Sequence, residues 1–205
     1  MKLYYTPGVC SLAPHIILRE AGFDFSLEKV NADTKVTDAG RNYLTVNPNG
    51  YVPALEIEPG VVLTEGPAIM QYLADQAPEA RLAPAAGTLA RYQLQSWLNF
   101  ITSELHKGFS PLFKPGMPAE AKTAFKEQLA ARFDHVERHL SKQDYLMPDG
   151  FSIADAYLFV VTGWSGFVGI DMQAWPAIGA FRKRVEARPA VQAALIGEGL
   201  LKKAA

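Results

Sequence analysis

The only cysteine of the 205-residue chain is its best candidate for nucleophilic chemistry. Cys10 follows the apolar and aromatic run Leu3–Tyr5 and a Pro-Gly pair, a pattern that predicts a buried strand ending in a turn. Pro14 lacks an N–H group and is tolerated only in the first turn of a helix, so a helix should begin near Cys10. Unpaired N–H groups at a helix start favour a thiolate, so we expect the pKa of Cys10 to lie below the value of roughly 8.5 for a free thiol. The alternative is an inert cysteine that packs as a small apolar residue.

A second candidate group lies on a long helix in the middle of the chain. Apolar residues recur there at steps of three and four and mark its buried face: Leu94, Trp97, Leu98, Ile101 and Leu105. Asn99, Ser103 and His106 stand at i, i+4 and i+7 and share one polar stripe. A solvated stripe more often carries Lys and Glu, so these residue types favour a binding face over an ordinary solvent face.

The remaining histidines do not suggest a metal centre. His15 lies on the side of the first helix, and His135 and His139 form an i, i+4 pair without a cysteine or carboxylate placed to complete a zinc site. A single cysteine also excludes an internal disulfide, which fits a reducing compartment. The net charge is −1, and the chain has no long apolar segment at its start or elsewhere. We therefore expect a cytoplasmic protein that binds neither nucleic acid nor a membrane.

The first part of the chain predicts a mixed sheet with two helices. Alternating apolar and polar residues in Phe23–Val30 predict a second strand, which completes a βαβ unit with parallel strands. Val52–Ile57 and Val61–Leu63 flank a Glu-Pro-Gly turn and predict a hairpin. Pro67 then opens a second helix. The order βαβ followed by ββα is that of a thioredoxin-like domain, which we place at residues 1–78.

The second part predicts only helices. The stretch Ala77–Gly87 is rich in Pro, Ala and Gly and is typical of a linker, so we place an all-α domain at residues 88–205. Ala119–Leu140 is a further amphipathic helix. Ser152 and Asp155 are spaced as a capping box at the start of an apolar helix, which gives them a structural role. The chain therefore falls in the α/β class, with an N-terminal thioredoxin-like domain followed by an all-α helical domain.

These candidate residues stand in motifs that closely resemble the glutathione S-transferases. Within that family the chain resembles the bacterial beta class, which carries a cysteine where other classes carry Tyr or Ser. The resemblance covers essentially the whole chain, and its most telling parts are Lys2–Ser11, Thr64–Gly66, and Trp97–Phe100 through Ser103–Lys107. It implies an enzyme that uses glutathione as a co-substrate, with no other cofactor and no metal.

The resemblance also implies a set of glutathione-binding residues around Cys10. Pro53 is then a cis-proline that holds Val52 so that its backbone pairs with the cysteinyl backbone of glutathione. Glu65 can take the α-ammonium group, and the free N–H of Gly66 at a helix start can take the α-carboxylate. A solvated carboxylate at a helix start is the alternative for Glu65. The rest lie by the same site, with Glu104 supplied by the partner subunit of a homodimer: Lys35, Asn99, Ser103, Glu104, His106 and Lys107.

Two kinds of reaction are open to such a site. In the first, the glutathione thiolate attacks a hydrophobic electrophile, with Cys10 and His106 as the catalytic residues. In the second, Cys10 forms a mixed disulfide with glutathione, which permits glutaredoxin-like thiol–disulfide exchange or glutathione-dependent reductive dehalogenation. We favour conjugation, a detoxification reaction, and a non-catalytic binder of hydrophobic ligands is a further alternative. The electrophile pocket should have an apolar lining: Val9, Phe109, Phe113, Trp164 and Phe167.

Overall fold

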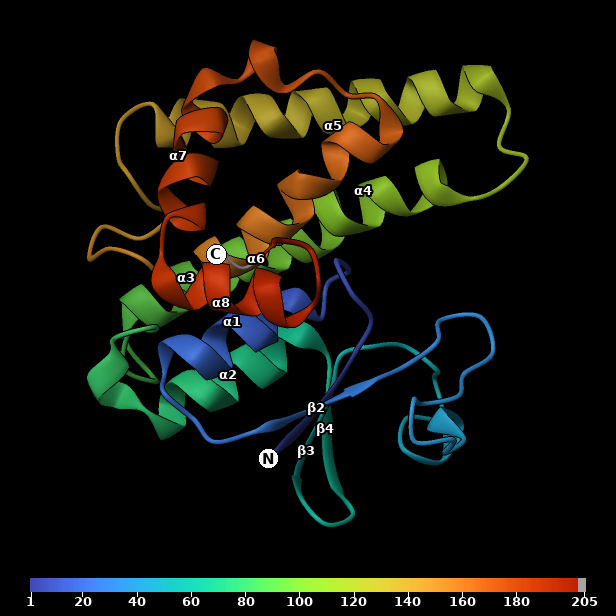
Figure 1. Cartoon of the computed structure of the whole chain (residues 1–205). Helices are drawn as coiled ribbons and strands as arrows, with labels where there is room; N and C mark the ends of the chain where they lie inside the picture. The colour runs from blue at the N-terminus through green and yellow to red at the C-terminus, as the bar shows by residue number, and fades with distance from the viewer. Residues whose placement is uncertain (203–205) are drawn as a thin grey trace. The chain divides into compact units, whose positions relative to one another are not determined.

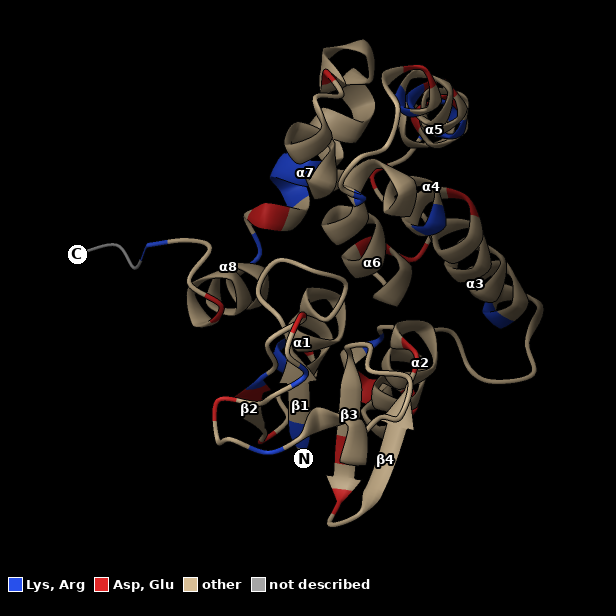
Figure 2. Cartoon of the chain, turned by 90° about the vertical axis from the view of Figure 1, so that its right-hand side faces the viewer, with Lys and Arg blue, Asp and Glu red and all other residues tan. Residues whose placement is uncertain are grey.

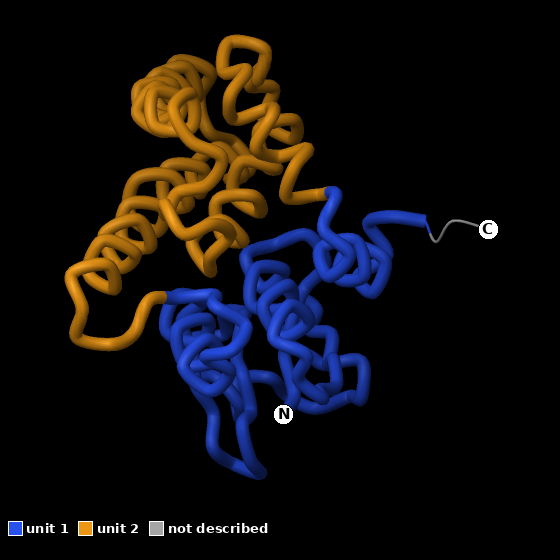
Figure 3. Tube along the Cα trace, turned by 90° about the vertical axis from the view of Figure 1, so that its left-hand side faces the viewer, with its two compact units in different colours: residues 1–83, 187–205 blue, residues 84–186 orange. Residues whose placement is uncertain are grey.

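The computed structural model describes residues 1–202, which divide into two compact units (Figure 3). Unit 1 comprises Met1–Ala83 together with the described residues after Glu186, and unit 2 comprises Pro84–Glu186. The division after residue 83 falls inside the stretch that the sequence marks as a linker.

The C-terminal segment groups differently from the sequence-based boundaries, which assign all of residues 88–205 to the second domain. α8 (Pro189–Gly197) packs against α1 (Leu12–Glu20) in unit 1. Arg188, the residue before α8, also joins the segment to α1. Its Nε and Nη2 groups donate to the two carboxylate oxygens of Glu20 at 2.6 and 2.9 Å. The segment after residue 186 therefore completes the first unit.

Unit 1 is built on a four-stranded mixed sheet (Figure 1). Its strands are β1 (Lys2–Tyr5), β2 (Ser26–Lys29), β3 (Ala54–Glu58) and β4 (Val61–Thr64). They lie in the order β2-β1-β3-β4, with β1 and β2 parallel and the other two pairs antiparallel. α1 connects β1 to β2, and α2 (Gly66–Gln76) follows β4. This is the predicted βαβ-ββα order, so the thioredoxin-like fold is confirmed.

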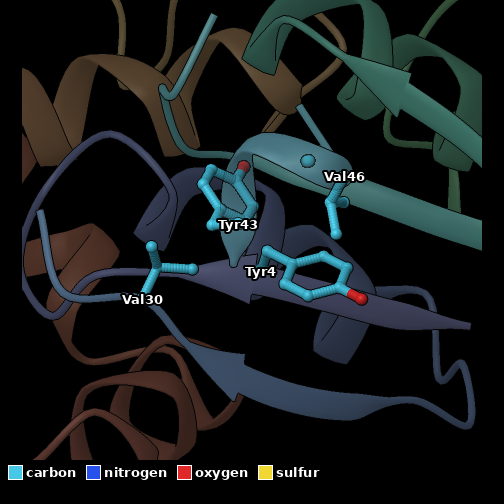
Figure 4. Close-up of a cluster of buried hydrophobic side chains, with 5 residues drawn as sticks. Tyr4, Val30, Tyr43 and Val46 are labelled. Carbon is cyan, nitrogen blue, oxygen red and sulfur yellow. The ribbon is translucent and has the colours of Figure 1, made fainter. Parts of the chain in front are cut away.

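Alternate residues of the strands pack on opposite faces of the sheet. Leu3 of β1 is paired with Leu55 of β3, and both side chains are fully buried. Tyr4 points to the other face, where its ring centroid lies 5.5 Å from that of Tyr43 in a short 3₁₀ turn. Figure 4 shows the cluster around this pair: Tyr4, Val30, Tyr43 and Val46. Through Tyr43 and Val46, the segment that precedes Val52 packs against the central strand β1.

Unit 2 is helical, as predicted. Its helices are α3 (Leu89–Phe100), α4 (Lys107–Phe109), α5 (Ala119–Leu140), α6 (Ile153–Thr162) and α7 (Pro176–Glu186). α5 has the bounds that its apolar spacing predicts, and it carries both acidic and basic residues (Figure 2). The long predicted helix forms, but between α3 and α4 it passes through a π-helical turn, Ile101–His106, that changes its period. Within residues 1–202, no helix has the length and apolar character needed to cross a membrane.

The predicted capping box forms at the start of α6. Asp155 Oδ2 accepts the backbone N–H of Ser152 at 2.9 Å and its hydroxyl at 2.7 Å, and Oδ1 accepts the N–H of Leu146 at 2.8 Å. All ten residues of α6 are buried, and burial raises the pKa of Asp155 to about 6. The box therefore satisfies polar groups at a helix end that water does not reach.

Replacing Ser152 with Ala should lower stability without changing catalysis. Loss of the hydroxyl removes one partner of Asp155, and we expect the free energy of unfolding to fall by about 1–2 kcal/mol. Thermal unfolding of this variant and of Ser141→Ala checks the prediction, since Ser141 is an exposed serine at the end of α5. Turnover per folded molecule should match the unmodified protein in both variants. A Ser152→Ala protein of normal stability that has lost activity would contradict the structural role.

Candidate active site

Cys10 lies in the turn that connects β1 to α1, just before Ser11 at the N-cap position. The N–H of Leu12 donates to the carbonyl of Val9 at 3.0 Å, and the N–H of Ala13 donates to Cys10 O at 3.2 Å. The turn therefore leads directly into the helix, as Pro14 predicts. The Sγ atom of Cys10 donates to Val52 O at 3.2 Å, which joins the two residues expected to bind the same part of glutathione.

A buried hydroxyl closes the loop that carries Cys10. Ser11 Oγ accepts the N–H of Thr6 at 3.2 Å and donates to Thr6 O at 3.1 Å. Thr6 Oγ1 in turn donates to Val30 O at the end of β2, at 2.8 Å. Ser11 is fully buried, so its hydroxyl takes the place of water for two backbone groups of the loop.

The segment before Pro53 is held in place by hydrogen bonds to the backbone of one residue. The Tyr51 carbonyl accepts the Tyr43 hydroxyl and the Asn47 side-chain amide, both at 2.7 Å. The Val52-Pro53 peptide bond is cis, as the resemblance implies. The Tyr43 cluster of the sheet therefore positions the carbonyl of Val52 beside Cys10.

Glu65 and Gly66 form the start of α2 next to this segment. Glu65 has a φ of +68°, an uncommon value for a residue with a side chain, and its carbonyl accepts the first helical N–H from Ile69 at 2.9 Å. A Cβ atom added to Gly66 would lie 3.8 Å from Pro53 Cγ, so the helix start lies against the cis-proline. Residues in sparsely populated backbone regions are concentrated at functional sites, which supports a binding role for Glu65.

Lys35 belongs to the same unit but already has a partner. Its Nζ donates to Gly50 O at 2.9 Å, two residues before Val52. Cys10, Lys35, Val52, Glu65 and Gly66 are therefore brought into one region of unit 1, as the sequence predicts.

The expectation of a low pKa for Cys10 is wrong for this structure. Burial of the sulfur raises the pKa to about 12, although the residue as a whole is partly exposed. The N–H groups of Cys10 and Ser11 lower it by less than burial raises it, and the Glu65 carboxylate raises it further. The hydrogen bond to Val52 O also needs the sulfur to carry its proton. Cys10 is therefore a neutral thiol at pH 7.

The residues expected on one polar stripe of unit 2 do not behave alike. Asn99 and Ser103 are exposed, and Ser103 Oγ donates to Asn99 O at 3.0 Å. The π-helical turn, with an i→i+5 pattern, changes the period between these residues and His106. Glu104 lies in that turn and pairs with Arg132 of α5, and Lys107 is exposed. A stripe drawn at regular α-helical spacing is therefore broken after Ser103.

His106 packs inward at the end of the π-helical turn. Its Nδ1 atom lies 2.6 Å from the hydroxyl of Tyr157, and its ring centroid lies 4.9 Å from that of Trp164. Burial lowers the pKa of His106 to about 4, and the positive charge of Lys107 adds to this shift. The imidazole of His106 is therefore mostly uncharged at neutral pH.

Glu198 and His15 are two buried residues that sequence reasoning did not assign to the site. Glu198 Oε2 accepts the N–H of Gly8 at 2.9 Å, and Oε1 lies 2.9 Å from His15 Nδ1. The other nitrogen of His15 accepts from Arg19 Nε at 2.9 Å. Gly8 has a φ of +73° and lies two residues before Cys10. The end of the chain therefore holds the loop that carries the cysteine.

A separate cavity of about 540 Å³ lies in unit 2 and contains none of the expected site residues. Its aromatic lining is Trp97, Phe100, His135 and His139. Within residues 1–202, no three His, Cys, Asp or Glu side chains are grouped so that they could hold a metal ion.

The sequence matches family models and curated proteins of one family. The family model "Glutathione S-transferase, N-terminal domain" matches residues 9–76, and "Glutathione S-transferase, C-terminal domain" matches residues 100–189. The glutathione S-transferase GstA of Escherichia coli O157:H7 is 46% identical, over 98% of this chain and 100% of that protein. The chain therefore belongs to the glutathione S-transferase family and is a glutathione transferase.

Solved structures narrow the class. BphK, a bacterial GST solved as a ternary complex, is 56% identical with a TM-score of 0.96, over 98% of this chain and 100% of that chain. The bacterial beta class enzyme of Sphingomonas chungbukensis is 50% identical with a TM-score of 0.95, over the same shares. A sphingomonad glutathione S-transferase complexed with glutathione is 51% identical with a TM-score of 0.95, also over 98% and 100%. The resemblance to the bacterial beta class is confirmed.

Replacing Glu198 with Ala should loosen the Cys10 loop. The change removes the acceptor of the Gly8 N–H and the buried partner of His15. We therefore expect the free energy of unfolding, measured in urea, to fall by on the order of 2 kcal/mol or more. The alkylation rate of Cys10 should rise at the same time, because the loop opens more often. The matched control is Glu79→Ala, since Glu79 is exposed. Unfolding and alkylation like those of the control would contradict the role given to Glu198.

Proposed function

We propose that this glutathione transferase conjugates the glutathione sulfur to hydrophobic electrophiles and that Cys10 can also form a mixed disulfide with glutathione. Glutathione carries an α-ammonium group, two carboxylates and a thiol, and the candidate residues offer a partner to each. Glu65 meets the ammonium and the Gly66 N–H meets the α-carboxylate, while Val52 pairs with the cysteinyl backbone. The sphingomonad relative that is complexed with glutathione supports this assignment.

The remaining candidates complete the proposed site. Lys35 and Lys107 are cations for the glycyl carboxylate, and Asn99 and Ser103 are exposed polar groups. An aromatic group of unit 2 suits a hydrophobic electrophile: Phe109, Phe113 and Trp164, whose rings pack against one another. A reducing cytoplasm supplies the reduced glutathione that this reaction consumes, and we place the enzyme there. Glutathione acts as a co-substrate, and no other cofactor belongs to the proposal.

The neutral thiol of Cys10 is the observation that favours conjugation over exchange. In conjugation with an aryl halide, the glutathione sulfur forms the new S–C bond while the carbon–halogen bond breaks, and the halide ion and the thiol proton are released to solvent. In exchange, Cys10 must itself attack the S–S bond of oxidised glutathione as a thiolate and release one glutathione thiolate. A thiol with a pKa of about 12 is ionised to about one part in 10⁵ at pH 7, so the second reaction is the slower one.

Removal of the Cys10 sulfur separates the two reactions. Cys10→Ala should keep most turnover of an aryl halide with glutathione, and it should lose every adduct with oxidised glutathione. In the unmodified protein, alkylation by iodoacetamide should stay slow at pH 7 and rise only in alkaline solution. Because Cys10 is the only cysteine, intact mass locates each adduct. Fast alkylation at pH 7 would show that Cys10 is ionised enough for exchange. Loss of conjugation in a stable Cys10→Ala protein would show that conjugation itself needs the Cys10 sulfur. Either result would contradict the proposal.

We also propose a two-fold homodimer. The resemblance implies that Glu104 of one subunit lies beside the glutathione of its partner, and a two-fold axis would then create two equivalent shared sites. Glu104 is partly exposed and held by Arg132, so its carboxylate is ordered at the surface of unit 2. Light scattering of the protein at micromolar concentration with glutathione should give twice the mass of one chain. The mass of a single chain would remove the dimer from the proposal.

A further inference from the structure

The π-helical turn Ile101–His106 interrupts the α-helical hydrogen-bond pattern between α3 and α4. Helices with an extra residue in one turn are frequent at functional sites, because the extra residue redirects a side chain. Here the turn ends at His106, and its neighbours Ile101 and Leu105 are fully buried. His106 consequently contacts α6 and the 3₁₀ turn after it, through Tyr157 and Trp164.

Two rings fix the orientation of the imidazole. The Tyr157 ring is 83° from the plane of His106, and the Trp164 ring meets it at 67° with centroids 4.9 Å apart. Tyr157 is only 3% exposed and lies in a helix buried on all sides, so its hydroxyl has little freedom to move. The 2.6 Å distance from that hydroxyl to Nδ1 lies within the range of a hydrogen bond that an O–H group donates.

The charge state of the ring determines what this hydrogen bond means. With a pKa lowered to about 4, His106 is neutral at pH 7, so one ring nitrogen carries a proton and the other is an acceptor. A phenol hydroxyl is a far stronger acid than the N–H of a neutral imidazole, and the unprotonated ring nitrogen is a stronger base than a phenol oxygen. The arrangement in which the hydroxyl donates to Nδ1 is therefore the more stable one.

We propose that Tyr157 is a positioning residue that donates its hydroxyl proton to Nδ1 of His106 and thereby holds the ring as the Nε2–H tautomer. His106 then presents a hydrogen-bond donor, which can stabilise a glutathione thiolate but cannot take a proton from the thiol. No covalent bond changes, and the proton stays on Nε2. This inference rests on the proposed function for the identity of the bound sulfur, whereas the tautomer is a property of the protein without ligand.

The tautomer can be read directly in ligand-free protein labelled with ¹⁵N-histidine. A long-range ¹H–¹⁵N spectrum separates a protonated ring nitrogen from an unprotonated one, and the chain has four histidines to resolve. A His106→Asn variant assigns the His106 signals by their loss. In the unmodified protein Nε2 should be the protonated nitrogen and Nδ1 the unprotonated one. A protonated Nδ1 overturns the proposal without any need for a Tyr157 variant.

Tyr157→Phe removes only the donor, and its effect separates positioning from stability. The His106 signals should move towards a mixture of the two tautomers, and kcat for an aryl halide should fall on the order of tenfold with little change in the KM for glutathione. Tyr145→Phe is the matched control, since Tyr145 packs against Phe151 and is remote in its contacts from His106. Unchanged tautomer populations in Tyr157→Phe would overturn the assignment. Absence of turnover in all proteins, with the tautomer shift present, would count against the proposed function alone.

Discussion

Every polar group that folding removes from water needs a partner, and this requirement shapes the loop that carries Cys10. The loop runs from a central strand into a helix; its residues Thr6 to Cys10 are partly exposed, and Ser11 at its end is fully buried. Ser11 and Glu198 supply the missing partners, one from within the loop and one from the far end of the sequence. The position of the sulfur depends on both.

Burial also determines the charge of the groups that could do chemistry. Cys10, His106 and Asp155 differ in type, yet the pKa of each is displaced towards the neutral form, because a charged group loses its hydration inside the protein. Helix N–H groups oppose this effect at Cys10, and hydrogen bonds oppose it at Asp155, but desolvation is the larger contribution at both. At neutral pH this leaves Cys10 and His106 uncharged, whereas Asp155, with a pKa of about 6, is still mostly a carboxylate.

The sequence predicted most of the fold because the relevant signals are local. Alternating residues marked the strands, and apolar spacing located α5 at both ends. The capping box at Ser152 needed only four residues to be recognised. The cis-proline and the grouping of Cys10 with Val52 came from the family motif. Each of these features is encoded in a short stretch of chain.

The features that the sequence did not predict arise from contacts between residues far apart along the chain or from the burial of side chains. Glu198 and Gly8 are 190 residues apart, so no local pattern joins them. The π-helical turn in α3–α4 leaves the residue order unchanged and alters only the backbone period, which broke the stripe drawn through His106. The pKa of Cys10 was misjudged because the helix start is visible in the sequence whereas the burial of the sulfur is not.

The return of α8 to unit 1 makes that unit discontinuous, since residues 84–186 intervene between its two segments. A ribosome delivers a chain from its N-terminus, and domains fold as their residues emerge. The β-sheet and α1 can form early, but Glu198 leaves the ribosome only after the whole of unit 2. During synthesis the Cys10 loop therefore exists for a time without the carboxylate that closes it. Cys10 therefore reaches its final environment only after the whole of unit 2 has been synthesised.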